Sequence, residues 1–316
     1  MSDHSDIERG SSSQINRRSV LRGIAAGGTA AVGVGAMSGT ASAAEEQCVA
    51  GLNLVEPAED YPVVERDPGI LGIGAGGLSE SGDVPQGEDE VVIYIHGWLE
   101  LFTGGAKAQG ATVQQALRNA GSEIATLAYN YPSSSPNWWG QKDGAEKSGR
   151  EFASWLQDYR EQNPETDVRL IVHSLGARAG AGLLDELVNE MGEDPVRSLE
   201  ILGGAISREA VTVDGEFGQA LANGAEEVNN YWSSADNILD EIFQIGEFGT
   251  EAVGAKGAPE DAETPDNYND IDVTGIVDGH CIYYDPEEGC METVVENFPA
   301  GFQGGGDSGG FFDDWF

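Results

Sequence analysis

Residues 170–177 read LIVHSLGA and are the stretch of sequence that is most informative about the fold. Hydrophobic residues at 170–172 lead into a short turn at residues 173–175, and small residues follow at 176, 177 and 179–182. A short apolar run of this length is typical of a buried β-strand, and the residues after it favour a helix. We therefore predict a strand that runs directly into a helix through a tight turn.

Apolar runs of strand length alternate with amphipathic helical stretches on both sides of this segment. Strands are expected at residues 91–95, 123–129, 168–172, 199–202, 228–232 and 271–277, and helices at 106–119, 144–162 and 175–191. This alternation predicts an α/β protein with a mostly parallel central sheet and helices on both faces. An edge strand is also expected within the Gly- and acid-rich residues 45–87.

Residues 91–98 read VVIYIHGW, a β-branched strand that ends in His96-Gly97. With the His-Ser-Leu-Gly segment at 173–176, it resembles the α/β-hydrolases of the lipase/esterase type, including exported haloarchaeal members. The resemblance covers roughly residues 88–290 and implies an α/β-hydrolase fold in which Ser174 is a nucleophile on a strained turn. Val172 departs from the family pattern, which usually has Gly at this position.

The resemblance also implies an oxyanion hole made of two backbone N–H groups. The residue after the nucleophile, Leu175, contributes one, and the loop after the strand at 91–95 contributes the other, which we assign to Trp98. His96, in the same loop, is interpreted as a buried residue that shapes the loop and transfers no proton.

A serine hydroxyl needs a neighbouring base to become a good nucleophile, so the mechanism requires a histidine. The chain has four. His4 lies in the N-terminal segment, His96 belongs to the oxyanion loop, and the turn should direct the ring of His173 away from Ser174. His280 remains, and it lies late in the chain, as the family order of serine, acid and histidine requires.

The acid that orients His280 should lie between Ser174 and His280, just after a strand. Asp236 follows the expected strand at 228–232 and is the predicted acid, although a helix N-cap is an ordinary alternative role for it. Asp240, Asp272 and Asp278 are the competing candidates.

Two tryptophans follow another expected strand, in residues 131–140 (YPSSSPNWWG). Ligands of open α/β sheets bind beyond the carboxyl ends of the strands, so Trp138 and Trp139 could line a substrate pocket. Packing in the core is an equal alternative. The chain has no Cys-x-x-Cys motif or histidine cluster, so no metal site is expected. No cofactor is implied.

These residues together predict a secreted serine hydrolase that cleaves small-molecule or lipid carboxylic esters through an acyl-enzyme. A catalytically inactive binding or surface protein with the same fold is the alternative. Residues 306–310 (GDSGG) look like the nucleophile motif of trypsin-like proteases. We reject that match because it lies in low-complexity sequence and such proteases need an all-β double barrel.

The chain is very acidic: 16 Lys and Arg stand against 55 Asp and Glu among 316 residues, a formal net charge of −39. Such a charge disfavours binding to nucleic acids, whose affinity depends on Lys and Arg, and to anionic membranes. Repulsion among these charges destabilises a compact fold in dilute buffer and is screened in concentrated salt. The composition therefore favours a protein from a high-salt habitat over an ordinary acidic protein.

The N-terminal residues resemble a twin-arginine export signal. Residues 16–22 (NRRSVLR) precede a weakly hydrophobic Ala/Gly stretch and a small-residue cleavage site near residue 44. A membrane-spanning helix is the alternative, although Gly, Ala, Ser and Thr dominate the stretch. We expect a cleaved signal at 1–44, an N-terminal extension at 45–87, the hydrolase domain at 88–299 and a Gly-rich tail at 300–316, with no stable membrane insertion after cleavage.

Export permits disulfides, and three cysteines follow the signal: Cys48, Cys281 and Cys290. The short spacing favours a bond between Cys281 and Cys290, and pairings with Cys48 stay open.

Overall fold

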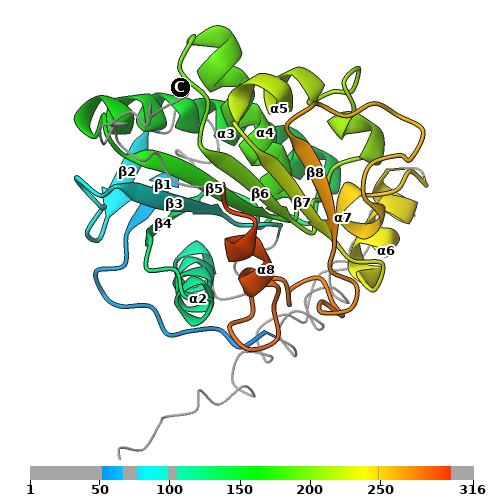
Figure 1. The fold of residues 1–316 in the computed structure, drawn as a ribbon, viewed down its shortest axis with the longest axis horizontal. Coiled ribbons are helices and arrows are strands. Elements are labelled where there is room, and N and C mark those ends of the chain that lie inside the picture. The colour runs from blue at the N-terminus through cyan, green and yellow to red at the C-terminus, as the bar shows by residue number, and fades with distance from the viewer. Residues whose placement is uncertain (1–51, 67–76, 99–104, 248, 300–316) are drawn as a thin grey trace, which may run out of the picture.

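The computed structural model describes residues 52–66, 77–98, 105–247 and 249–299. An eight-stranded sheet runs through the molecule in the order β2-β1-β4-β3-β5-β6-β7-β8 (Figure 1). Its strands are β1 (Val63–Arg66), β2 (Leu78–Ser81), β3 (Glu90–Ile95), β4 (Ala125–Asn130), β5 (Asp167–His173), β6 (Ser198–Leu202), β7 (Val228–Trp232) and β8 (Tyr268–Asp272). Only β2 pairs antiparallel, and all other neighbours in the sheet are parallel.

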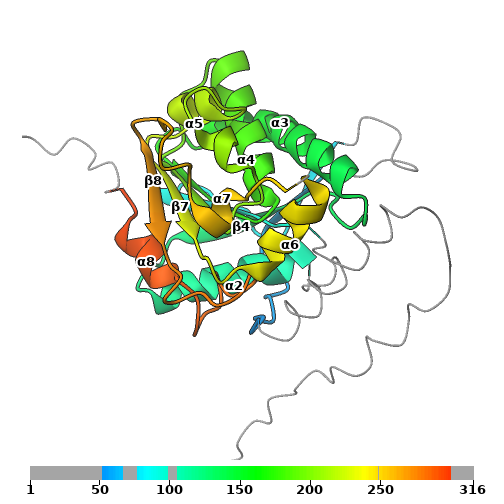
Figure 2. The same ribbon diagram turned by 90° about the vertical axis from the view of Figure 1, so that its right-hand side faces the viewer.

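Helices cover both faces of the sheet, as Figures 1 and 2 show. One face carries α2 (Gly105–Asn119) and α8 (Met291–Glu296), and the other carries α3 (Trp138–Gln162), α4 (Gly176–Leu184) and α5 (Gly218–Gly224). The remaining elements are a π-helical turn η4 (Asp185–Glu190), a 3-10 turn η5 (Arg208–Val211), α6 (Asn237–Gly246) and α7 (Val253–Lys256). The central strands β5 and β6 are buried almost throughout because helices lie on both sides of them. The expected class of fold is therefore confirmed.

The element boundaries differ from the expected ones in two places. The last strand is β8, at Tyr268–Asp272, and not the apolar run at 271–277. Residues after β8 turn instead, with the N–H groups of Ile276 and Val277 donating to the Val273 carbonyl at 2.8 Å. An edge strand pairs through its backbone, as β8 does with β7, so a hydrophobic run is not needed there. The Asn230 side chain adds a hydrogen bond to Asp270 at 2.8 Å.

The second difference is the start of α3, which begins at Trp138, whereas the helix was expected from residue 144. The edge strand expected within residues 45–87 is present, since both β1 and β2 lie there.

Helices α3 and α4 approach each other closely through glycines. A Cβ on Gly149 of α3 would lie 1.8 Å from the carbonyl oxygen of Ala179, and one on Gly182 of α4 would lie 2.5 Å from that of Glu146. The helix that follows residue 174 is therefore held tightly against its neighbour.

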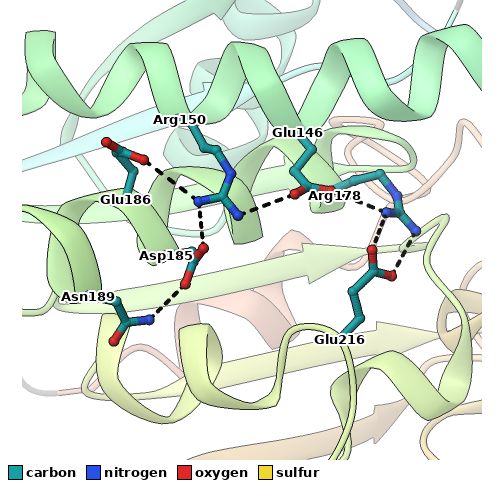
Figure 3. A network of polar contacts seen from close by, with 7 residues as sticks. All are labelled: Glu146, Arg150, Arg178, Asp185, Glu186, Asn189 and Glu216. Carbon is teal, nitrogen blue, oxygen red and sulfur yellow. Dashed lines mark hydrogen bonds and ion pairs between the residues drawn. The ribbon is translucent and has the colours of Figure 1, made fainter.

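A chain of ion pairs runs alongside this contact (Figure 3). Arg178 of α4 pairs with Glu216 at 3.0 Å and with Glu146 at 3.5 Å. Glu146 also pairs with Arg150 at 3.3 Å, and Arg150 reaches Asp185 at 2.6 Å. Because Arg178 is almost fully buried, its pairs are screened less by salt than exposed ones. The network joins α3, α4, η4 and the segment before α5.

Candidate active site

Ser174 lies in the turn between β5 and α4 with a φ of +56°, the one positive φ of a non-glycine residue among those the structure describes. This left-handed conformation costs roughly 1 kcal/mol or more for a residue with a Cβ. Two glycines make the turn possible: a Cβ on Gly97 would lie 2.7 Å from the Ser174 Cβ, and one on Gly176 would lie 2.4 Å from the Ile95 carbonyl oxygen. The sequence between β5 and α4 therefore forms the expected strained turn.

The turn forms although Val172 replaces the usual glycine. Val172 is fully buried on β5, on the side of the sheet that α4 covers. A Cβ on Gly180 of α4 would lie 3.0 Å from Cγ1 of Val172. The valine side chain is thus accommodated by a glycine on the facing helix.

His280 lies between Ser174 and Asp236. Its Nε2 is 2.8 Å from Ser174 Oγ, and its Nδ1 is 2.7 Å from Asp236 Oδ2. Because a carboxylate can only accept, Nδ1 carries a proton and donates it to Asp236. In neutral His280 the lone pair of Nε2 therefore faces the Ser174 hydroxyl. The structure brings together the three side chains that the sequence predicted would meet.

Asp236 has both of the roles that were weighed for it. Its Oδ1 accepts from the Leu239 N–H at 3.1 Å, which caps α6, while its Oδ2 accepts from His280. The side chain is fully buried. Of the competing acids, Asp272 and Asp278 are exposed, and Asp240 lies on α6 beyond the cap.

Tyr283 is a neighbour of this site that the sequence did not reveal. Its hydroxyl donates to the Gly254 carbonyl at 3.1 Å and lies 3.5 Å from Asp236 Oδ2. Gly203, with a φ of +53°, leaves room for the ring, because a Cβ there would lie 2.7 Å from Tyr283 Cε2. No short motif marks such a residue, since its role depends on a contact across 47 positions of sequence.

His96 is buried under the loop after β3, as expected. Its Nδ1 donates to the Gly97 carbonyl at 2.8 Å, and its ring stacks on Tyr131 with 4.4 Å between the centroids. The Tyr131 N–H donates to Nε2 at 3.2 Å. Both ring nitrogens are therefore hydrogen-bonded to backbone groups, as is expected of a residue that shapes the loop.

The two predicted oxyanion donors, the N–H groups of Leu175 and Trp98, come from different segments of the chain. Leu175 directly follows Ser174 and precedes α4, and Trp98 lies in the loop beside Gly97, whose Cα faces Ser174. Within the described ranges, no backbone carbonyl accepts from the N–H of either residue. The Trp98 side chain is anchored by its Nε1–H, which donates to the Ser135 carbonyl at 2.7 Å.

Trp138 and Trp139 are placed differently. Trp138 is 1% exposed and packs edge-on against Trp98 and Phe243, with its Nε1–H donating to Glu247 at 2.6 Å. Trp139 is 40% exposed, and its Nε1–H donates to the Gly246 carbonyl at 3.0 Å. Trp138 thus packs in the core behind Trp98, whereas Trp139 lies at the surface.

Residues 83–239 match a family described as "Alpha/beta hydrolase of unknown function (DUF900)". The match includes Ser174 and Asp236, whereas His280 lies beyond its end. The chain has the α/β-hydrolase fold.

Solved structures with some likeness to this α/β-hydrolase fold come from several organisms. A thioesterase from the prodiginine biosynthetic pathway in Streptomyces coelicolor is 16% identical with a TM-score of 0.26, over 37% of this chain and 40% of that chain, so this chain spans less than half of its length. A serine hydrolase without a lid from Xanthomonas campestris is 17% identical with a TM-score of 0.42, over 78% of this chain and 99% of that one. A fungal esterase from Rhizomucor miehei is 13% identical with a TM-score of 0.45, over 83% and 88%. No curated protein matches the sequence.

The cysteines are not paired as their spacing suggested. Cys281, which follows His280, is disulfide-bonded, whereas Cys290 is a free thiol. The predicted bond between Cys281 and Cys290 is therefore wrong. Cys290 is buried, its thiol faces the Tyr283 carbonyl oxygen at 3.5 Å, and burial raises the pKa of the thiol to about 12. Cys48 lies outside the described residues.

The described residues form neither a metal site nor a membrane-spanning helix. No group of three or more His, Cys, Asp or Glu side chains in those ranges is arranged to hold a metal ion. None of the helices there combines the length and the apolar character that crossing a bilayer requires. The predicted export signal at 1–44 and the tail at 300–316 lie outside the described residues.

Proposed function

We propose that the protein is a serine hydrolase that cleaves carboxylic esters through an acyl-enzyme. The observation that carries the proposal is the continuous contact from Ser174 Oγ to His280 Nε2 at 2.8 Å and from His280 Nδ1 to Asp236 Oδ2 at 2.7 Å. A hydroxyl, a base and an orienting acid in this order are what nucleophilic catalysis by serine requires.

In the proposed first half-reaction, Ser174 Oγ attacks the ester carbonyl carbon while its proton passes to His280 Nε2. The negative charge of Asp236 stabilises the imidazolium that forms. The N–H groups of Trp98 and Leu175 donate to the oxyanion, and each such donor is typically worth about 3 kcal/mol of barrier. The imidazolium then protonates the leaving alkoxide.

In the second half-reaction, water replaces the alcohol. His280 Nε2 takes a proton from the water, the resulting hydroxide attacks the acyl carbonyl, and Ser174 leaves with the proton returned from His280. No cofactor takes part in the proposed cycle. Trp139, which is exposed and follows Trp138 in the chain, is the proposed contact for the acyl or alcohol portion of a small-molecule or lipid ester. Trp138, packed against Trp98, is proposed to support this side of the substrate pocket.

A fluorophosphonate probe, which modifies activated serines, tests the proposal directly. We expect it to label the wild-type protein and not Ser174→Ala, with Ser122→Ala, in the turn after α2, as the matched control that stays labelled. A series of p-nitrophenyl esters of increasing acyl length, assayed in molar salt, then defines the substrate. Absence of both labelling and ester cleavage in folded wild-type protein would favour the alternative, an inactive binding protein.

A shortened chain ending at residue 300 tests the GDSGG segment at 306–310 as a competing nucleophile site. We expect it to retain ester cleavage, because the proposed reaction uses no residue beyond His280.

We also propose that the protein is exported by the twin-arginine route into a high-salt exterior. The support is the NRRSVLR segment at 16–22 and the net charge of −39. Replacement of Arg17 and Arg18 by Lys should retain the chain inside the cell, and N-terminal sequencing of the exported product should begin near residue 44. Export of the double variant at the wild-type level would contradict the proposal.

A further inference from the structure

His173, the residue before the proposed nucleophile, contacts the backbone of the proposed base. Its Nε2 lies 2.8 Å from the carbonyl oxygen of His280, and its ring centroid is 4.8 Å from that of the His280 ring. A carbonyl oxygen only accepts, so His173 Nε2 carries the proton and donates it. The contact joins positions 107 residues apart in the sequence.

The contact follows from the geometry of β5. Successive side chains of a strand point to opposite faces, so His173 lies on the face opposite Val172, which Gly180 of α4 covers. On its own face the ring lies edge-on to Tyr284, with 5.1 Å between the centroids. The same strand end therefore presents the Ser174 hydroxyl to His280 and a second imidazole to the backbone of His280.

His280 lies in no helix or strand. The position of its imidazole therefore depends on what holds its backbone. Beyond Cys281, the segment is held by the Tyr283 hydroxyl, which donates to the Gly254 carbonyl at 3.1 Å, and by the Tyr284 hydroxyl, which donates to Gln109 at 3.2 Å. The bond from His173 acts on the carbonyl group of His280 itself, next to the disulfide-bonded Cys281.

We infer that His173 is a positioning residue for the proposed reaction: its Nε2–H holds the His280 carbonyl and so keeps the His280 imidazole between Ser174 and Asp236. The inference rests on the proposed function. In this role His173 acts through His280 and does not touch the substrate.

The surroundings also keep His173 uncharged. Burial lowers the pKa of His173 well below 6.5, and the nearby rings of His280 and His96 lower it further, although the hydrogen bond to the His280 carbonyl acts in the opposite direction. The other titratable groups that face the rings of His173 and His280 are Asp236, which accepts from His280, and the phenols of Tyr283 and Tyr284, which lie beside His173. A neutral His173 adds no second positive charge beside the imidazolium that His280 forms during catalysis.

Three variants separate this role from a merely structural one. His173→Phe keeps a ring and removes the donor, and His173→Gln keeps an amide N–H that reaches about as far as Nε2. Tyr159→Phe, on α3, removes the hydrogen bond of another buried side chain to a carbonyl, that of Pro85 at 2.9 Å, away from His280. We expect His173→Phe to lower kcat at least about tenfold with little change in KM, because a misplaced base affects the chemical step more than binding. His173→Gln should restore most of kcat, and Tyr159→Phe should leave it unchanged.

Proton NMR of the free protein provides a readout that does not depend on ester cleavage. The Nδ1 proton of His280, held by Asp236, should give a far-downfield resonance in the wild type, in His173→Gln and in Tyr159→Phe, and a broadened or shifted one in His173→Phe. If His173→Phe does not fold, His173→Asn, whose shorter amide cannot reach the His280 carbonyl, replaces it with the same expectations.

The inference is overturned if His173→Phe keeps wild-type kcat and the wild-type resonance, or if Tyr159→Phe loses as much activity as His173→Phe. Failure of the proposed function looks different: the wild type would neither cleave esters nor react with the fluorophosphonate, while the resonance would still report whether His173 holds His280.

Discussion

Gly180 of α4 faces Val172 of β5, so that a Cβ on the glycine would lie 3.0 Å from Cγ1 of the valine. The two residues share one volume between the strand and the helix that flank Ser174. The larger side chain is on the strand here, and the helix supplies the space. This exchange explains how Ser174 reaches a φ of +56° without a glycine two residues before it.

The pair predicts non-additive substitutions. Gly180→Ala should destabilise the wild type, because the core has no room for the methyl group, and should cost less or become stabilising in a Val172→Ala background, where alanine's better helix propensity dominates. We expect a coupling free energy of about 1 kcal/mol from urea unfolding of the four proteins. Additive effects would show that the two side chains do not compete for space.

The backbone of Ser174 predicts a difference between two inactive variants. Ser174→Ala keeps a Cβ in the left-handed conformation, whereas Ser174→Gly removes it, so the free energy of unfolding should be about 1 kcal/mol higher for the glycine variant. Both should lose fluorophosphonate labelling. Equal stability of the two variants would mean that the turn carries no strain.

The two oxygens of Asp236 predict separable effects. Asp236→Asn keeps an oxygen that can cap α6 but removes the charge that orients His280, so kcat should fall on the order of 10³-fold or more while stability changes little. Asp236→Ala should lose similar activity and also about 1 kcal/mol of stability, because the cap is lost. Ester kinetics and thermal unfolding measured on both variants check this, and a stable, fully active Asp236→Asn would contradict it.

The contact between α3 and α4 predicts opposite outcomes for two glycines on one helix. Gly149→Ala places a methyl group 1.8 Å from the Ala179 carbonyl oxygen and should destabilise the protein by about 3 kcal/mol or more. Gly144→Ala has nothing within 4 Å and should be neutral or stabilising by up to about 1 kcal/mol. Denaturant unfolding at fixed molar salt compares them, and a neutral Gly149→Ala would show that the helices can move apart freely.

Glu200 predicts a pH dependence of stability. Burial raises its pKa from 4.5 to about 7, although Ser198, Asn229, Tyr231 and Arg169 all favour the charged form. Below pH 4.5 the carboxyl is protonated in both states. Between 4.5 and 7 the unfolded state ionises while the folded state holds its proton, so the free energy of unfolding falls as pH rises.

Glu200→Gln removes this effect. Relative to the wild type, its stability should increase from pH 4.5 to 7, by up to roughly 3 kcal/mol. Glu260→Gln, at an exposed position, is the control and should follow the wild type. A constant difference between Glu200→Gln and the wild type across this range would show that Glu200 is already ionised in the folded protein.

The sequence alone determined the α/β class and the three side chains of the candidate site. The class follows from the alternation of apolar runs with helical stretches along the chain. The site follows because residues that come directly after parallel strands meet at one edge of the sheet. Elimination among four histidines then left His280, and the order along the chain favoured Asp236.

Only the tertiary structure decided the contacts between residues far apart in sequence. These are the space that Gly180 leaves for Val172, the hydrogen bond from His173 to the His280 carbonyl, the buried position of Trp138, and the free thiol of Cys290 in place of the expected disulfide. Spacing along the chain sets which residues can be neighbours within one element, whereas the packing of the sheet against its helices sets which distant side chains share a volume.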